Sequence, residues 1–340
     1  GTNGVMGQAA SNGTANKRGF TVGINGATLL NNTASTWEIW RDTDSPEYNP
    51  IYNGDLTFDG SGDFNINDFI NGSISITKIG AGALDLTRNN GYTGTTNINA
   101  GTLSITNGGG LGNSSTGTTV ADGAMLKISG GITVAEPITI NGSGVSSDGA
   151  IYFLSGNNTY SGAITLGSNS TITSDAGNQT VSGTINGAYT LDVTAAGNWT
   201  QSGTVGGTSP LTQYEVNAGS NDVSLSATIN VDGAITIYGS SINTNANLTT
   251  TAAAGHIKLL ASDDISVASG ITLTTSGSAG DVILAADTDN SSGGAISASG
   301  ALTISTNGGD IILGGGDTSG SDFTDGEGSN QVGIRITGNI

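Results

Sequence analysis

Short stretches of alternating apolar and polar residues run along most of this chain. Residues 190–194 (TLDVT) and 234–238 (AITIY) place apolar side chains at every second position, so each can bury one face of a strand. No eleven-residue window has apolar residues at helical spacing opposite a charged face. Gly, Asn or Asp separates nearly every pair of stretches, and these residues accommodate turns. The pattern predicts an all-β protein of many short strands with almost no helix.

One phrase of the sequence occurs twice. Residues 89–106 read NNGYTGTTNINAGTLSIT and residues 157–173 read NNTYSGAITLGSNSTIT. Aligning Tyr92 with Tyr160 sets the copies 160 − 92 = 68 residues apart. A strand–turn–strand phrase that repeats without helices indicates a repeat architecture in which like units stack on one another.

A second phrase recurs closer to the C-terminus. HIKL begins at His256, DVIL at Asp281 and DIIL at Asp310, each after a glycine, at intervals of 281 − 256 = 25 and 310 − 281 = 29 residues. Two more alternating stretches lie within each interval. Three strands that close one coil are typical of a parallel β-helix (β-solenoid), and we predict this fold class with about three short strands per coil. The apolar residues expected to point inward include Leu84, Leu103, Ile105, Ile164, Leu166, Ile235, Ile257, Leu259, Ile283, Ile311 and Leu313.

A meander of hairpins is the alternative fold. It would use two-residue Asn-Gly or Asp-Gly turns at regular spacing. Such dipeptides are present at residues 25–26, 71–72, 148–149 and 232–233.

Three zones organise the chain. Residues 1–55 are the least repetitive, and we expect them to form an irregular N-terminal cap or lead-in, because a solenoid must cover its terminal coils. Residues 56–340 are expected to form the β-helix. Within it, residues 56–200 have closely spaced short strands, and residues 201–340 follow the longer phrase.

Composition excludes several classes of function. Eight Lys and Arg stand against 27 Asp and Glu, and the net charge of −19 makes nucleic acid an improbable partner. No apolar run approaches 18 residues, so we predict no transmembrane segment. The chain has no Cys, which rules out a cysteine nucleophile and disulfides. No signal peptide opens the chain, so either it has been removed or the chain is an internal section.

A family resemblance rests on two neighbouring segments. Lys78–Thr87 (KIGAGALDLT) and Asn90–Leu103 (NGYTGTTNINAGTL) closely resemble the autotransporter-associated β-strand repeat, K-x-G-A-G-T-L-x-L-T … N-x-Y-T-G-x-T-x-I-N-A-G-T-L. Ala83 replaces the usual Thr, and the copy around Tyr160 is weaker. The coils of residues 201–340 are more similar to those of filamentous-haemagglutinin-type secreted proteins.

The resemblance implies a right-handed, single-stranded parallel β-helix that is secreted from, or displayed on, a Gram-negative cell. It does not fix an activity, because such passengers include adhesins, matrix proteins, toxins and stalks. We expect a section of a secreted or surface-displayed adhesin or extracellular matrix fibre, without enzymatic activity. Its expected partners are a host or neighbouring-cell glycan or protein, or a second copy. The alternatives are a carbohydrate-active β-helix (a polysaccharide lyase or glycosidase) and a passive spacer stalk.

Two groups of residues are candidates for binding on loops, where sequence variation is tolerated. Aromatic rings stack on sugars and on proteins, and the dense aromatic group comprises Trp37, Trp40, Tyr48 and Tyr52. Its structural alternative is a cap core over the first coil. The acidic group lies in a Gly/Ser-rich stretch, with a solvated loop as its alternative, and comprises Asp317, Asp322, Asp325 and Glu327.

We predict no cofactor, although one segment resembles a calcium loop. Asp59, Ser61, Asp63 and Asn65 offer oxygen ligands at alternate positions. Phe64 occupies the position that needs Gly, however, and Ile70 replaces the bidentate Glu. A Gly-rich turn followed by a strand is the structural alternative.

No residues are predicted to be catalytic. Asp263 and Asp264 are adjacent, so on one strand they would face opposite sides, whereas a glycosidase needs two carboxyls across one sugar. Together with Lys258 they are the place to look for a lyase. His256 is the sole His, and an outward strand position explains it more simply.

Overall fold

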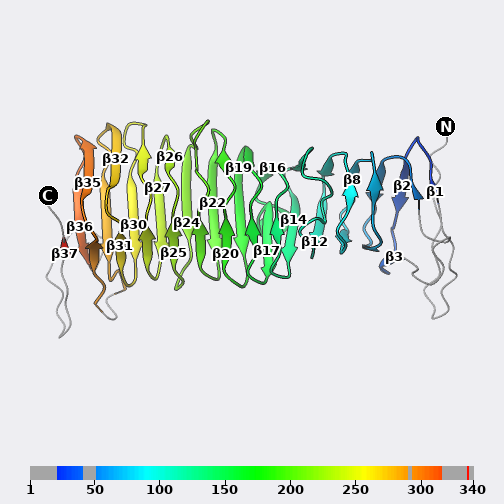
Figure 1. Ribbon diagram of the computed structural model, residues 1–340, viewed down its shortest axis with the longest axis horizontal. Coiled ribbons are helices and arrows are strands. Elements are labelled where there is room, and N and C mark those ends of the chain that lie inside the picture. The colour runs from blue at the N-terminus through cyan, green and yellow to red at the C-terminus, as the bar shows by residue number, and fades with distance from the viewer. Residues whose placement is uncertain (1–20, 41–50, 290–292, 316–334, 337–340) are drawn as a thin grey trace. The chain divides into compact units, whose positions relative to one another are not determined.

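The computed structural model describes residues 21–40, 51–289, 293–315 and 335–336. The chain forms two compact units, Gly1–Ile164 and Thr165–Ile340. In each unit, short parallel strands stack coil upon coil as a β-solenoid (Figure 1). The helical element in the described part is one 3-10 turn, η2 (Val145–Ser147). No helix found there has the length and hydropathy to cross a membrane.

In the first unit, each coil supplies up to three strands. The first strands are β1 (Thr21–Val22), β4 (Ile51–Tyr52), β7 (Asn71–Gly72), β10 (Gly91–Tyr92), β15 (Thr133–Val134) and β18 (Thr159–Tyr160). The second strands are β2 (Ala27–Leu30), β5 (Leu56–Asp59), β8 (Ile76–Lys78), β11 (Thr96–Ile98), β13 (Thr118–Val120) and β16 (Ile138–Gly142). The third strands are β3 (Trp37–Trp40), β6 (Phe64–Asn67), β9 (Ala83–Leu86), β12 (Gly101–Ile105), β14 (Ala124–Ser129) and β17 (Ile151–Ser155).

The second unit repeats this plan. Its long strand β19 (Ile164–Ser174) starts at the last residue of the first unit. The first strands are β20 (Gln179–Val181), β23 (Trp199–Gln201), β25 (Val223–Leu225), β28 (Ile242–Thr244), β31 (Ile265–Val267), β34 (Ile296–Ala298) and β37 (Arg335–Ile336). The second strands are β21 (Ile185–Asn186), β26 (Ile229–Val231), β29 (Leu248–Thr250), β32 (Ile271–Ser278) and β35 (Leu302–Asn307). The third strands are β22 (Thr190–Ala195), β24 (Gln213–Asn217), β27 (Ile235–Gly239), β30 (Ile257–Ala261), β33 (Val282–Ala286) and β36 (Ile311–Gly315).

Strands of neighbouring coils pair in parallel, which confirms the β-solenoid and shows that the hairpin meander is wrong. Even Asn71-Gly72, a candidate hairpin turn, is a strand that pairs in parallel with Gly91-Tyr92. The register stacks equivalent positions, so inward side chains form continuous columns of the core. One column of the first unit contains Phe64, Leu84, Leu103, Leu126 and Ile151. A column of the second contains Leu191, Tyr214, Ile235, Ile257, Val282 and Ile311.

Most of the residues predicted to point inward are buried, but the prediction for Ile283 is wrong. It is aligned with Lys258, while its neighbours Val282 and Leu284 are aligned with the buried Ile257 and Leu259. Ile283 therefore faces outward, because alternation allows only one face of the strand to enter the core. Ile311 shares the inward column of Val282 but is 49% exposed.

The zones predicted from the sequence have different boundaries from the two compact units. In the segment 1–55, strands β1 to β3 already pair in parallel with β4, β5 and β6, so its described part forms a coil. The division between compact units falls at residue 164, whereas the sequence pattern changes near residue 200.

Stacked glycines explain the Gly-x-Gly of the repeat. Gly60 and Gly62 lie in the turn between β5 and β6, and Gly80 and Gly82 lie in the equivalent turn of the next coil. A Cβ on Gly80 would overlap the backbone of Gly60, and one on Gly82 would overlap Gly62. The turns approach closely enough to continue the ladder only because neither coil has a side chain there.

Candidate functional site

The aromatic group predicted as a binding surface is partly integrated into the first unit. Trp37 is half-buried and lies edge-on to Phe64, with ring centroids 5.7 Å apart. Phe64 in turn lies edge-on to Phe58 at 5.2 Å. The structure describes Trp40 by its backbone in β3 alone, and Tyr48 lies outside the described residues.

Tyr52 belongs to the core. Its side chain is 8% exposed, and its hydroxyl donates a 3.1 Å hydrogen bond to Oδ2 of the buried Asp68. Burial, and then the Asp68 carboxylate, raise the pKa of Tyr52 well above its ordinary value. In this conformation the ring is not presented to a ligand.

None of the acidic binding candidates falls within the described ranges. Asp317, Asp322, Asp325 and Glu327 lie outside the described residues. Across the described ranges, no three His, Cys, Asp or Glu side chains are grouped so that they could hold a metal ion.

The turn that resembles a calcium loop uses two of its oxygens within the fold. Asp59 Oδ1 accepts the Gly60 N–H at 2.7 Å, and Asp63 Oδ1 accepts the Ala83 N–H of the next coil at 2.7 Å. Ser61 is exposed, and the Asn65 Oδ1 is buried without a hydrogen bond. The carboxylates therefore stabilise the turn and its stacking.

The residues considered for a lyase do not form an acid–base pair in the structure. Asp264 Oδ1 accepts the Ala295 N–H at 2.8 Å, and Lys258 lies on the outward face of β30 between Thr236 and Ile283. Burial and then the Asp264 carboxylate raise the pKa of Asp263. In the described part of the chain, no ion pair joins Lys258 to either carboxylate.

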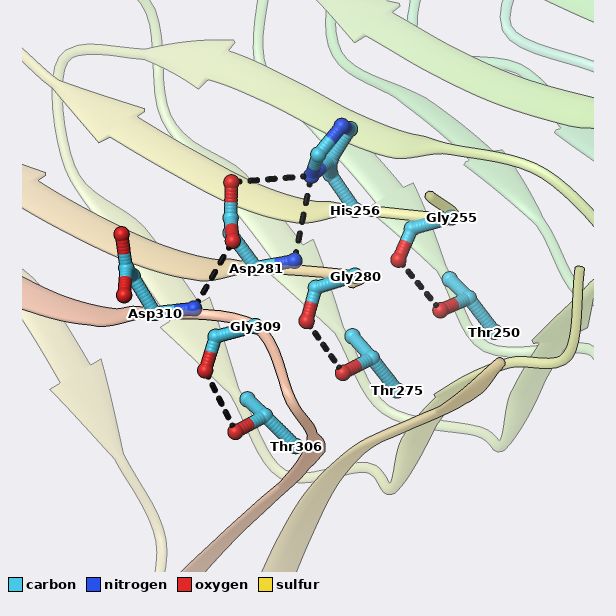
Figure 2. A network of polar contacts seen from close by, with 9 residues as sticks. All are labelled: Thr250, Gly255, His256, Thr275, Gly280, Asp281, Thr306, Gly309 and Asp310. Atoms are coloured by element: carbon cyan, nitrogen blue, oxygen red, sulfur yellow. Dashed lines mark hydrogen bonds and ion pairs between the residues drawn. The ribbon is translucent and has the colours of Figure 1, made fainter. Parts of the chain in front are cut away.

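His256 belongs to a ladder of turn residues (Figure 2). Its Nδ1 accepts the Asp281 N–H at 3.1 Å and lies 3.3 Å from Asp281 Oδ2. Asp281 Oδ1 then accepts the Asp310 N–H at 2.8 Å. His256 thus takes the place that an aspartate fills in the next coil.

Three threonines lie beside this ladder, one per coil (Figure 2). The hydroxyls of Thr250, Thr275 and Thr306 donate to the carbonyls of Gly255, Gly280 and Gly309, at 3.0, 2.6 and 2.8 Å. Each bond satisfies a carbonyl of the turn, two residues before the next strand begins. The repeated phrase around His256, Asp281 and Asp310 is therefore a repeated turn.

The same use of a side-chain acceptor recurs in both units. Apart from Asn169, which lies within β19, each acceptor is the residue just before a strand, and all of them accept the N–H of the stacked counterpart in the following coil. The acceptors are Asp55, Asp63, Asn169, Asn178, Asn198, Asp222, Asn247, His256, Asp264 and Asp281. The Asn and Asp residues between strands therefore bind coil to coil as well as permitting turns.

The Asn and Tyr of the repeated phrase are buried. Asn90 accepts the Ile70 N–H at 3.0 Å and donates to the Gly110 carbonyl at 2.8 Å, so it joins three successive coils. Its counterpart Asn158 accepts the N–H groups of Gly131 and Ile132, both at 3.0 Å.

The two repeat tyrosines, both 0% exposed, have different partners. The Tyr92 hydroxyl is 2.6 Å from the Thr96 hydroxyl, and the Tyr160 hydroxyl donates to the Glu136 carbonyl at 2.7 Å. The phrase thus encodes internal clamps of the solenoid.

The buried charged residues Asp68, Lys78 and Glu136 were not predicted. Lys78 is 1% exposed and stacks between Phe58 and Ile98, with its Nζ donating to the carbonyls of Gly80 and Ala100. Glu136 is 3% exposed. Alternation gave a signal for the latter two, because Lys78 is two residues from the inward Ile76, and Glu136 is two from Val134.

Coils of this kind define a parallel β-solenoid repeat protein, with one set of turn and core clamps used again in successive coils. The family model of the passenger-associated-transport-repeat matches residues 76–105 and 151–169. The match to these two segments confirms the resemblance seen in the sequence, and the segments include Lys78, Tyr92 and Tyr160. The match indicates an exported protein, either secreted or displayed at a surface. The searches of curated proteins and of solved structures find no match.

Proposed function

We propose that this chain is a section of an adhesin or extracellular matrix fibre that a Gram-negative bacterium secretes or displays, and that its role is structural and binding. The observation that carries the proposal is the passenger repeat itself, whose Asn, Tyr and Gly residues serve to join coils. A scaffold of this type gains length by adding coils, since each coil contacts only its neighbours.

A column of small polar side chains on the second unit supports a role in contacting a partner. From β20 to β34, the outward central positions of the first-strand sheet are Ser, Thr or Asn, and register aligns them in one column: Thr180, Thr200, Ser224, Asn243, Ser266 and Ser297. Small uncharged side chains leave this face flat and hydrogen-bonding. They suit contact with a glycan, a protein or a second copy better than binding to a polyanion.

Specific binding is proposed to lie in two segments, residues 37–55 and residues 315–330. The candidates remain Trp37, Trp40 and Tyr48 in residues 37–55, and the acidic residues of the segment 315–330. The core position of Tyr52 assigns it a supporting role.

A binding screen of the full chain tests this function. The chain is presented to arrays of host glycans, to matrix proteins and to itself, alongside variants that lack residues 42–49 or 317–327. A third variant, Ser224→Arg/Asn243→Arg, alters the polar column, and Thr236→Arg on the outward face of β27 is its matched control. Saturable binding that one loop deletion abolishes supports the proposal.

Other results of the screen point elsewhere. Binding lost only in Ser224→Arg/Asn243→Arg would move the site to the flat face. Absence of all binding would favour a spacer. Release of reducing ends or unsaturated products from polysaccharides would overturn the non-catalytic role.

A further inference from the structure

Glu136 places a carboxyl group inside the core of the first unit. It follows β15 and precedes β16, at alternate spacing with the buried Val134 and Ile138, and its own exposure is 3%. Neither carboxyl oxygen has a hydrogen bond of normal geometry. The hydroxyl of Thr118, also 3% exposed, likewise makes no hydrogen bond of normal geometry. Buried polar groups are nearly always satisfied, so this pair needs an explanation.

Among the residues that the structure describes, the strands around Glu136 supply no inward-facing positive charge. The ionisable groups that face it are the repeat tyrosines, Tyr92 from β10 and Tyr160 from β18. Both hydroxyls are engaged elsewhere, with the Thr96 hydroxyl and the Glu136 backbone carbonyl. Strands β13, β15 and β16 contain no ionisable residue. Lys127 of β14 lies on the outward face, aligned with Ser104 and Tyr152.

An ionised carboxylate without a cationic partner is costly in such a place. Burial raises the pKa of the Glu136 carboxyl to about 7, and the nearby Gly117 N–H and Thr118 hydroxyl offset this only in part. We propose that Glu136 is a proton-dependent lock: the folded coil holds it as the neutral acid, and its ionisation expels the side chain and opens the turn between β15 and β16.

The opening would be local: it would break the coil-to-coil hydrogen bonds made by the residues on either side of Glu136. The Thr118 N–H donates to the Pro137 carbonyl at 2.8 Å, and the Ser161 N–H donates to the Val134 carbonyl at 2.7 Å. The Tyr160 hydroxyl is bonded to Glu136 itself. Moving residues 134–138 outward breaks these contacts and releases the tyrosine of the second passenger repeat.

The direction of the pH effect follows from linkage. The folded state binds the Glu136 proton more tightly than the unfolded state, so folding weakens as pH rises. The loss begins near pH 4.5, where an ordinary glutamate ionises, and is complete near pH 7. Over the whole titration, from well below pH 4.5 to well above pH 7, the folding equilibrium constant is expected to fall roughly 300-fold.

Direct titration of the carboxyl tests the proposal. The full chain is labelled with ¹³Cδ-glutamate, which gives five signals, and Glu136→Gln identifies the signal of Glu136. We expect this signal to titrate near pH 7. A midpoint near 4.5, the value of an exposed glutamate, would overturn the proposal.

Stability provides the second readout. Unfolding is followed at pH 4.5 and pH 7.5 for the full chain, for Glu136→Gln and for Asp68→Asn, whose buried carboxyl accepts hydrogen bonds from the Tyr52 hydroxyl and the Phe69 N–H. Relative to Glu136→Gln, the wild type and Asp68→Asn should each lose roughly 100-fold in folding equilibrium over this range. Parallel pH profiles for the wild type and Glu136→Gln would refute the lock.

Discussion

Replacing the buried Lys78 with Met should change how stability depends on pH. The Lys78 ammonium lies in an inward column of the first unit, between Phe58 and Ile98. Burial lowers its pKa to about 8, although the carboxylates of Asp59 and Asp63 partly oppose the shift. The folded state therefore binds this proton less tightly than the unfolded state does.

The magnitude follows from the two pKa values. Between the ordinary value of 10.5 and a folded value of about 8, the shift corresponds to about 3 kcal/mol. A base whose pKa is lowered in the folded state destabilises the fold by the full amount below the folded-state pKa. This destabilisation disappears as pH rises from the folded-state pKa to the unfolded-state pKa. The free energy of unfolding of the wild type should thus rise by about 3 kcal/mol relative to Lys78→Met between pH 8 and pH 10.5.

Urea unfolding across this pH range measures the difference. A Trp199→Phe background leaves Trp37 and Trp40 as the tryptophan reporters, and both lie in the first unit. Lys127→Met, on the outward face of β14, controls for the removal of a lysine from the surface. Tyrosine ionisation affects all variants equally and cancels in the comparison. A difference between wild type and Lys78→Met that stays constant across the range would refute the reasoning.

Three further predictions concern the turns. Gly80→Ala should destabilise the first unit by about 1–3 kcal/mol in urea unfolding, because its Cβ meets the Gly60 backbone, whereas Gly23→Ala, with nothing within 4 Å, should have little effect. Thr275→Val leaves the Gly280 carbonyl unsatisfied and should cost about 1–3 kcal/mol, and Thr274→Val, aligned outward with Thr249 and Ser305, is its control. His256→Asn should preserve the acceptor for the Asp281 N–H, while His256→Ala should lose about 1 kcal/mol and increase hydrogen exchange at Asp281. Equal stability of the two His256 variants would argue against the ladder.

Alternation and spacing predicted the coil but not every face. Three strands per interval could be read from residues 256–313, because period-2 patterns and Gly/Asn/Asp turns mark each strand. The orientation of Val282-Ile283-Leu284 could not be read, since three consecutive apolar residues fit either face. Register decides it, by aligning Val282 and Leu284 with Ile257 and Leu259.

The buried charges were missed for a different reason. Lysine and glutamate are rarely buried, so residue type argued against inward positions for Lys78 and Glu136 even though alternation favoured them. The role of Asn90 and Asn158 as clamps could not be derived either, because their partners are backbone groups on other coils. Those contacts exist only once the register is set.

The turn acceptors also give the solenoid a direction. In each such pair, the earlier coil provides the side-chain acceptor and the later coil provides the N–H, as with Asp281 and Asp310. A duplicated coil therefore carries both halves of the connection, and its insertion leaves every junction complete. Gene duplication and recombination can lengthen or shorten such a protein one coil at a time, and loss of a single acceptor weakens one junction while the others stay intact.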